Sequence, residues 1–348
     1  MQELTLNRCN RCAEPAKVFL PYGPHRFCAA HFNSFFESRV QSTIRQGKLI
    51  KYGEKIAIGV SGGKDSMATL HLLHNAYGKT SQNKIEAIMI DEGIRGYRDR
   101  ALQIGAKYCD ENGIDYHVVK YQDGLGVDMN EVMKKIHEDP NLGSTCSFCG
   151  VFRRDFLNDK ALEINAEKLA TGHNLDDEVQ SIAMSLFGSD FGRASRLGPT
   201  TGERKFEKMV PRIKPLYETP EKDIIAYTAM NGIEHYSEEC CPYSWMAKRN
   251  HYRKMLNELE DSLPGTKYSI LASFRKMKPL LESFEKEHGK SPGECSRCGS
   301  PANGELCGTC RQMERLVEMP VDKKSNPSKS LKKQGTLTCA QTKGTASQ

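Results

Sequence analysis

Long apolar runs are missing from this sequence of 348 residues, which argues against a membrane-spanning protein. No run approaches the length that a membrane-spanning helix needs. The N-terminus has Glu3 and Arg8 among polar residues and lacks the apolar stretch of a secretory signal peptide. We therefore expect a cytoplasmic protein with no membrane partner, long enough for one large domain with appendages or for two domains.

A large net charge is also missing, so net charge alone does not indicate a nucleic-acid partner. The formal charge is +6, but residues 319–348 hold six lysines against Asp322 alone. The rest of the chain is close to neutral, and only local clusters can argue for a polyanionic partner. The same tail is rich in Ser, Lys, Thr, Gly and Gln, and we predict that it is disordered because it has little apolar area to bury.

Cysteine, by contrast, is abundant, with thirteen residues. A reducing compartment disfavours disulfides, so metal or sulfur chemistry is the better explanation of the paired spacing. Two groups, each of two ligand pairs, have the spacing of closed tetrahedral zinc sites. The predicted ligands are Cys9, Cys12, Cys28 and His31 in the first group, and Cys295, Cys298, Cys307 and Cys310 in the second.

The stretch 56–66 predicts a strand, a phosphate-sized turn and the start of a helix. Ile56–Val60 is apolar and rich in β-branched residues, Ser61-Gly62-Gly63 is the turn, and helical spacing begins at Asp65. Two consecutive glycines let backbone N–H groups converge on an anion, and Lys64 adds a positive charge. A polyphosphate is the expected occupant, although the spacing is not that of a Walker motif.

Strand and helix patterns alternate after this turn, which indicates a parallel sheet covered on both faces, with ligands at the carboxyl ends of its strands. Asp91 and Gly172-His173 follow two of these strands. Asp91 could bind a ribose or adenine edge, or simply cap a helix. The carboxylates at 176–178 suit Mg²⁺, or they complement a helix dipole, which we favour for Glu178. The further predicted strands are 85–90, 116–120 and 168–171, and the helices are 98–112, 130–137, 176–187 and 220–230.

A third cysteine pair, Cys146-x-x-Cys149, opens a predicted helix that also carries Arg153 and Arg154. A helix N-terminus and nearby guanidinium groups favour the thiolate form. By itself the pair could be a redox couple, half of a metal site or part of the core.

Two basic segments suggest a polyanionic second substrate. The first is the glycine-rich stretch 188–214, expected to be an irregular loop, and the second is a helix predicted from Trp245. Their cations are Arg193, Arg196, Arg204, Lys205, Lys208, Arg212 and Lys214, and Lys248, Arg249, His251, Arg253 and Lys254.

With these motifs in order, the sequence resembles the TtuA-type tRNA 2-thiouridine synthetases and their wobble-uridine relatives, which are PP-loop ATP pyrophosphatases. The resemblance covers nearly the whole chain before the tail. It rests on the Cys/His group, Ser61–Ser66, Asp91–Gly93, Cys146–Cys149, Thr171–Asp177, Ser195–Pro199, Glu238–Pro242 and the terminal cysteines.

The resemblance implies an α/β fold, a Rossmann-like PP-loop domain with a parallel sheet, flanked by zinc-binding modules. It also implies a 4Fe-4S cluster held by Cys146, Cys149 and one later cysteine, so that one iron stays open. This chain has both Cys240 and Cys241 where the family has one cysteine, and counting back from Pro242 selects Cys241. The expected reaction uses ATP to adenylate the C2 oxygen of a tRNA uridine and then replaces that oxygen with sulfur.

The family's residue roles carry over to matching positions. Asp65, Asp177 and Arg153 are the candidate catalytic residues; Arg153 stands where some members have lysine, so we expect charge stabilisation only. Asp177 would orient Mg²⁺. The ATP-binding residues are Ser61, Gly62, Gly63, Lys64, Asp65, Ser66, Asp91, Gly172 and His173.

The resemblance further implies a homodimer and a sulfur donor, either a ubiquitin-like carrier protein or free sulfide. A T-loop uridine is favoured over the wobble uridine. The alternatives are a PP-loop tRNA cytidine modifier, forming 2-thiocytidine or lysidine, and a non-catalytic zinc scaffold that binds ATP and tRNA.

The predicted domain boundaries are a zinc module at 1–50, the PP-loop domain at 51–235, a helical tRNA-contacting region at 236–290, a zinc ribbon at 291–318 and the tail at 319–348.

Overall fold

The structure, a computed structural model, describes residues 8–79, 82–94, 96–202, 208–237, 241–288 and 293–316. The predicted disordered tail lies outside these residues, as do Cys240, Arg204 and Lys205. In the described ranges, no helix combines the length and apolarity needed to cross a membrane.

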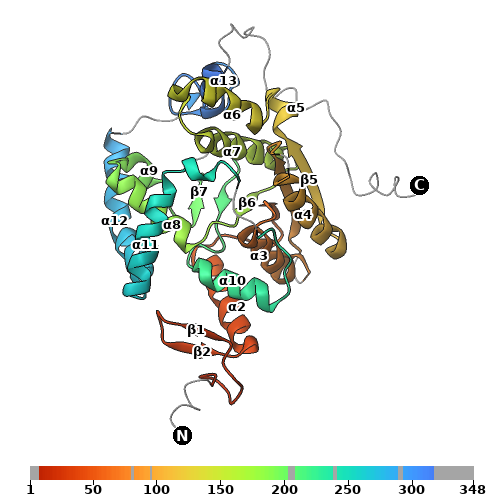
Figure 1. The fold of residues 1–348 in the computed structure, drawn as a ribbon, viewed down its shortest axis with the longest axis vertical. Helices are drawn as coiled ribbons and strands as arrows, with labels where there is room; N and C mark the ends of the chain where they lie inside the picture. Colours follow the sequence, from red (N-terminus) through yellow and green to blue (C-terminus); the bar gives the residue numbers. More distant parts are fainter. Residues whose placement is uncertain are drawn as a thin grey trace, which may run out of the picture.

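A six-stranded sheet forms the centre of the fold, with the strand order β5-β4-β3-β6-β8-β7 (Figure 1). Its first five strands are mutually parallel, and only the edge strand β7 is antiparallel. The strand order reverses between β3 and β6, which is where open α/β sheets bind their ligands. The bounds are β3 Lys55–Gly59, β4 Lys84–Asp91, β5 Asp115–Lys120, β6 Lys168–Thr171, β7 Thr200–Thr201 and β8 Arg212–Ile213.

Helices cover both faces of the sheet, because successive strand side chains point to opposite sides. Ile56 and Ile58 of β3 pack into one core, whereas Ala57 packs into the other. The expected α/β fold is confirmed. The first face is covered by α2 (Ala29–Gln46), α3 (Lys64–Leu73), α4 (Arg98–Asn112) and α10 (Glu221–Met230), and the second by α6 (Met129–Glu138) and α7 (Thr145–Glu163).

A separate helical layer packs beside the sheet around a third core that includes Val179, Leu271 and Phe274 (Figure 1). The helix predicted from Trp245 begins only at Arg249, after a short 3₁₀ turn. This layer consists of α8 (Leu175–Phe187), α9 (Phe191–Ser195), α11 (Arg249–Ser262) and α12 (Thr266–His288).

The composition of the stretch 188–214 predicts an irregular loop, but its described part contains three short regular elements. It forms α9, β7 and β8, because Ala194 and Ile213 are fully buried and anchor it to two cores. Lys214 is also buried, in an ion pair with Glu178. That ion pair, rather than a helix dipole alone, accounts for the acidic side chain at Glu178. Because Lys214 is buried in it, Lys214 is no longer a candidate contact of a polyanion.

The two terminal cysteine groups lie at opposite ends of the long axis of the molecule (Figure 1). The N-terminal group is built on β1 (Val18–Leu20), β2 (His25–Phe27) and the start of α2. The C-terminal group is built on β9 (Gly293–Glu294), β10 (Pro301–Ala302) and α13 (Gly308–Leu316). Between them run the shorter elements η1 (His74–Gly78), α5 (Tyr121–Leu125), η2 (Pro140–Leu142) and η3 (Ser244–Met246).

The N-terminal group is joined to the sheet through α2. Phe36 of this helix is fully buried and stacks on Tyr227 of α10, with ring centroids 4.2 Å apart. The two aromatic residues belong to the same core as Ile56 and Ile58. The helix that begins in the cysteine group therefore ends as part of the main core.

Replacing Phe36 by alanine should lower the free energy of unfolding by about 3–5 kcal/mol, because the truncation leaves a cavity in a core that spans two parts of the chain. Phe19→Ala is the matched control, since the Phe19 side chain is 53% exposed and should cost little. Chemical denaturation of both variants measures the difference. Equal losses would show that α2 is not part of the main core.

Candidate functional site: a phosphate-binding loop and three cysteine groups

The turn after β3 is closely backed by α4. Gly62 has φ +81°, and a Cβ atom there would lie 2.2 Å from the carbonyl oxygen of Ala101. Only glycine meets both conditions without strain. Within the turn, the Ser66 hydroxyl donates to the Gly63 carbonyl at 2.9 Å and accepts from the Ser61 N–H at 3.1 Å. The loop is therefore held in shape by its own side chains.

The N-terminus of α3 has the properties of an anion site. Its N-cap is Gly63, which has no side chain to satisfy the first N–H groups of the helix. Lys64 stands beside them, with its Nζ 2.6 Å from Glu221 and 3.2 Å from Asp65. A phosphate group at this position would find backbone donors, the helix dipole and a cation together.

The loop after β6 packs directly on the same turn of α3. A Cβ atom on Gly172 would lie 2.7 Å from the carbonyl carbon of Asp65, so the backbones approach closely. Asn174 then caps α8 through a reciprocal capping box with Asp177, and its Nδ2 donates to Asp65 at 3.3 Å. The two motifs that follow β3 and β6 therefore lie next to each other in the structure.

The carboxylates of Asp177 and Glu221 lie near Asp65 and, with burial, shift its pKa. Burial is the largest cause, and the neighbouring charges of Asp177 and Glu221 act in the same direction, while Lys64 opposes them. Together they raise the pKa of Asp65 from its usual value near 3.8 to about 6. Arg249 of α11 partly neutralises the cluster, because it donates to Asp177 at 2.8 Å. Carboxylates so placed suit a divalent cation.

His173 extends this site at the carboxyl end of β6. Surrounding protein lowers its pKa to about 4 by desolvation, and Lys214, Arg249 and Arg212 add to the effect although Asp177 opposes it. The residue is nevertheless exposed to solvent. The imidazole is therefore neutral at pH 7, and its Nδ1 lies 2.9 Å from the Thr171 hydroxyl.

Asp91 ends β4 at the same edge of the sheet. Its carboxylate accepts from the N–H of Gly93 at 2.9 Å, which shapes the turn that follows the strand. The described contacts thus give Asp91 a local role; nucleotide contact stays a prediction.

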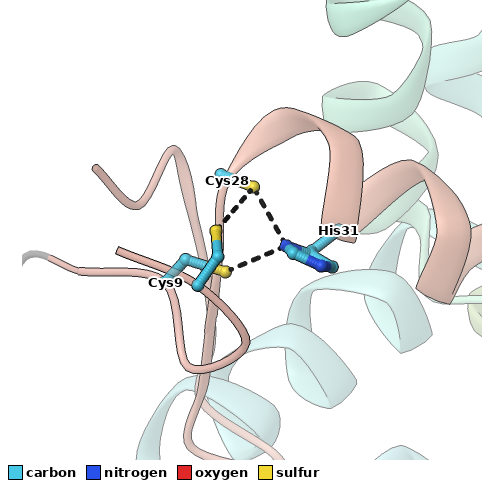
Figure 2. Close-up of side chains that lie close together, drawn as sticks. Cys9, Cys28 and His31 are labelled. Carbon is cyan, nitrogen blue, oxygen red and sulfur yellow. Dashed lines mark hydrogen bonds between the residues drawn. The ribbon is translucent and has the colours of Figure 1, made fainter. Parts of the chain in front are cut away.

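The N-terminal cysteine group has the dimensions of a zinc site (Figure 2). Zn–S and Zn–N bonds in a tetrahedron place two sulfurs about 3.8 Å apart and a sulfur and nitrogen about 3.5 Å apart. Cys12 and Cys28 have their sulfurs 3.7 Å apart, and the Nδ1 of His31 lies 3.5 Å from Cys9 and 3.3 Å from Cys28. The four predicted ligands therefore fit one metal ion.

The C-terminal group repeats this geometry with four sulfurs within 4.8 Å of one another, and Cys298 and Cys307 are 3.6 Å apart. The group docks on α7. The Thr309 hydroxyl donates to Asp155 at 2.5 Å, and Lys135 donates to the Leu316 carbonyl at 2.6 Å.

The central cysteines form a wider group at the N-terminal end of α7, next to the part of the helix that the C-terminal group contacts. Cys146 and Cys149 lie one turn apart in its first two turns, on the same side. Cys146 Sγ lies 3.7 Å from the carbonyl of Tyr243, two residues after Cys241. Burial, together with the charges of Cys149 and Cys146, raises the pKa of Cys241 to about 11. Among the described residues, these three are not gathered as closely as the two terminal groups.

Comparison with known proteins identifies the family of this chain. Residues 32–260 match the PP-loop domain family. The chain is 33% identical over 320 residues to the tRNA 2-thiolation protein NcsA of Haloferax volcanii, covering 88% of this chain and 98% of that protein. The chain belongs to the PP-loop tRNA 2-thiolation family. The predicted family membership is confirmed.

Other members of the tRNA 2-thiolation family carry different target names. One relative is the tRNA-5-methyluridine(54) 2-sulfurtransferase of Pyrococcus horikoshii, 34% identical over 87% of this chain and 93% of that protein. Another is the cytoplasmic tRNA 2-thiolation protein 1 of Caenorhabditis elegans, 36% identical over 92% and 84%. The solved U34-tRNA thiolase NcsA from Methanococcus maripaludis, with its [4Fe-4S] cluster, aligns at a TM-score of 0.75 and 32% identity, covering 90% of this chain and 98% of that one.

Several site residues were not predicted for this member of the tRNA 2-thiolation family. Glu221 has no sequence signal that links it to Lys64, 157 positions away. Arg249 was assigned to a cationic helix face, but it turns toward Asp177. Glu92 and Arg98 form a buried ion pair, and only Glu92 belonged to a noted motif.

Several basic residues in the described part of 188–214 make internal contacts, although the Arg196 and Lys208 side chains remain 48% and 55% exposed. Arg212 donates to the Arg154 carbonyl at 3.0 Å, Lys208 to the Gly299 carbonyl at 2.8 Å, and Arg196 pairs with Glu285. These contacts join the stretch to α7, to the C-terminal cysteine group and to α12.

We predict two zinc ions per chain, one in each terminal group. Cys9→Ser and Cys310→Ser should each remove one ion, because a closed site needs all four ligands. Metal analysis of the purified variants measures this. Cys109→Ser is the control, since Cys109 is fully buried outside both groups and should leave the zinc content unchanged. Full zinc content in Cys310→Ser would contradict the assignment.

We also predict that Asp65→Asn changes the pH dependence of stability. The wild-type carboxyl has a folded pKa of about 6, above its usual 3.8, so the folded protein binds its proton more tightly than the unfolded chain. Ionising Asp65 therefore costs stability as the pH rises from about 4 to about 6. The stability of Asp65→Asn relative to wild type should rise over that window, as measured by denaturation at several pH values. A constant difference would argue against the shift.

Proposed function

We propose that this protein is an ATP-dependent tRNA 2-thiouridine synthetase that forms AMP and pyrophosphate. The observation that carries the proposal is the placement of a phosphate-binding loop and a cysteine group in one site. Arg98 contacts the Ser61 carbonyl of the loop at 2.7 Å, and Arg153 contacts Cys149 at 3.3 Å. Glu92 contacts both arginines, so the two centres are separated by a few side chains.

The proposed 4Fe-4S cluster would be held by Cys146, Cys149 and Cys241. These three sulfurs are not all within 4.8 Å of one another, unlike those of the terminal groups, and a four-iron cube needs a wider group than a single ion does. Arg153 offers positive charge beside Cys149, which favours thiolate ligation. When bound with three protein ligands, such a cluster supplies an open iron that can carry sulfur to the activated uridine. Cys240 lies outside the described residues, so the choice of Cys241 stays a prediction.

Adenylation would use the loop and the carboxylates. The N–H groups at the start of α3 and Lys64 would bind the pyrophosphate of ATP, as the anion-site geometry supports. Asp65 and Asp177 would hold Mg²⁺, which neutralises the phosphates and makes pyrophosphate a better leaving group. Neutral His173 could accept or donate a hydrogen bond at the AMP moiety without adding charge. Once adenylated, the uridine C2 oxygen would leave with AMP.

Arg153 would stabilise negative charge in this reaction. Its guanidinium contacts both Glu92 and Cys149, so its charge stands beside a proposed cluster ligand. Its guanidinium stays protonated and cannot act as a base.

The tRNA surface would include α11. Lys248, His251, Arg253 and Lys254 are exposed on this helix, and Trp245, 69% exposed, stands just before it. Cations with an aromatic neighbour suit phosphate contact and base stacking. Arg249 of the same helix reaches the carboxylate cluster, so this surface borders the proposed ATP site.

A T-loop uridine is our proposed target, with sulfur supplied by a ubiquitin-like carrier protein or free sulfide to a homodimer in the cytoplasm. Relatives named for position 54 and for U34 are about equally similar to this chain. Thiolation assays on tRNA with either uridine replaced by cytidine separate the two targets. Loss of product only with the T-loop replacement would support the proposal, and loss only with the wobble replacement would overturn that choice.

The function is tested by anaerobic purification with iron and sulfide analysis, and by the tRNA-dependent formation of AMP and pyrophosphate. We expect about four irons per chain in the wild type, and loss of iron with retention of zinc in Cys146→Ala and Cys241→Ala. Cys109→Ala should keep both metals. An iron-free wild type that still forms AMP would indicate lysidine-type chemistry, and no AMP formation would indicate a scaffold.

A further inference from the structure

A buried carboxylate stands between two guanidinium groups at the carboxyl end of β4. Glu92 is 2% exposed, with one oxygen 2.8 Å from Nε of Arg98 and the other 2.6 Å from a terminal nitrogen of Arg153. Arg98 is itself 2% exposed. Burying the charges of Glu92 and Arg98 is costly unless they are paired, so this arrangement has to be specified by the fold.

One end of this triad reaches the phosphate-binding loop. Arg98 begins α4 and donates to the carbonyl oxygens of Ile90 and Ser61. The same helix supplies the Ala101 carbonyl that backs Gly62. Arg98 therefore fixes Glu92 to the element that shapes the loop.

The other end reaches the cysteines. The Arg153 nitrogen that donates to Glu92 also donates to Cys149 Sγ at 3.3 Å. The Arg153 side chain is 43% exposed, so packing alone does not hold it. A free arginine side chain populates many rotamers, and the contact with Glu92 holds Arg153 in one that faces Cys149 Sγ.

The backbone around Glu92 is tied to the cysteine loop as well. The N–H of Met129 donates to the Glu92 carbonyl at 3.0 Å, and Asn130 donates to the Gly93 carbonyl. Tyr243, which follows Cys241, donates to Asn130 at 2.9 Å. The backbone at Glu92 is therefore linked through Met129 and Asn130 to Tyr243. Tyr243 follows Cys241 and contacts Cys146.

We propose that Glu92 is a positioning residue for sulfur transfer: it holds the Arg153 guanidinium against Cys149 and, through Arg98, keeps this cation in register with the phosphate-binding loop. The inference rests on the proposed function, because it assigns Glu92 to the same thiolation site. The carboxylate also offsets the positive charge of Arg153 next to Cys149.

The test is Glu92→Gln in the reconstituted holoprotein. The amide keeps the shape but removes the charge, so Arg153 loses its anchor and its charge is no longer offset. We expect kcat to fall on the order of tenfold while KM for ATP changes little. We also expect the midpoint potential of the cluster to become more positive, because uncompensated positive charge favours the reduced form.

A double-mutant cycle separates positioning from a purely structural role. In an Arg153→Gln background, Glu92→Gln should cause less than half of its effect on kcat and on the potential, because it acts through Arg153. Equal effects in both backgrounds, or no effect in either at full iron content, would overturn the proposal. A lower melting temperature without a change in potential would likewise overturn it and leave only a structural ion pair.

Two further variants keep the test decisive. Glu163→Gln breaks an ion pair with Lys160 at the other end of α7 and should leave kcat and potential unchanged. If Glu92→Gln does not fold, Glu92→Asp replaces it: the charge is kept but the reach is shorter, so kcat should fall while the potential stays close to wild type. Unchanged kcat would overturn the proposal. A wild-type protein that binds no iron would instead refute the proposed function, so the two failures are distinguishable.

Discussion

The close approach of two backbones at the carboxyl ends of β3 and β6 is the constraint on which the rest of the site depends. Gly172 lies against the first turn of α3 so tightly that a Cβ atom would overlap the Asp65 backbone, and Gly62 is equally confined by α4. Two loops without side chains at these positions can converge on one small volume. That convergence places the start of α3, Asp65 and the α8 cap together, as an anion and a cation bound to it would require.

Charge is balanced across this volume by partners from distant parts of the chain. Lys64 faces Glu221 of α10, and Asp177 faces Arg249 of α11. A second set, Arg98, Glu92 and Arg153, extends from the loop to Cys149. Because like charges are held close in a partly buried site, no member can be removed without changing the charge state or position of the others.

The terminal cysteine groups support this arrangement from opposite ends. One begins α2, which packs into the main core through Phe36. The other docks on α7, the helix whose first turns carry Cys146 and Cys149. Metal binding in small modules is coupled to their folding. The zinc ions predicted for the two modules would therefore stabilise helices that contribute to the centre of the molecule.

The sequence by itself determined the elements whose physics is local. The sequence was enough to predict three features, because neighbouring residues produce them. These are the strand, glycine turn and helix N-terminus at 56–66, the ligand spacings at both termini, and the alternation of strands and helices. Only the tertiary structure decided which charges meet. The partners in the pairs Lys64–Glu221, Glu178–Lys214 and Glu92–Arg153 are far apart in sequence. No local sequence pattern indicates which partner a charged side chain will meet. Helix α9 and the short strands β7 and β8 were not predictable for the same reason, since Ala194 and Ile213 are buried by other elements of the fold.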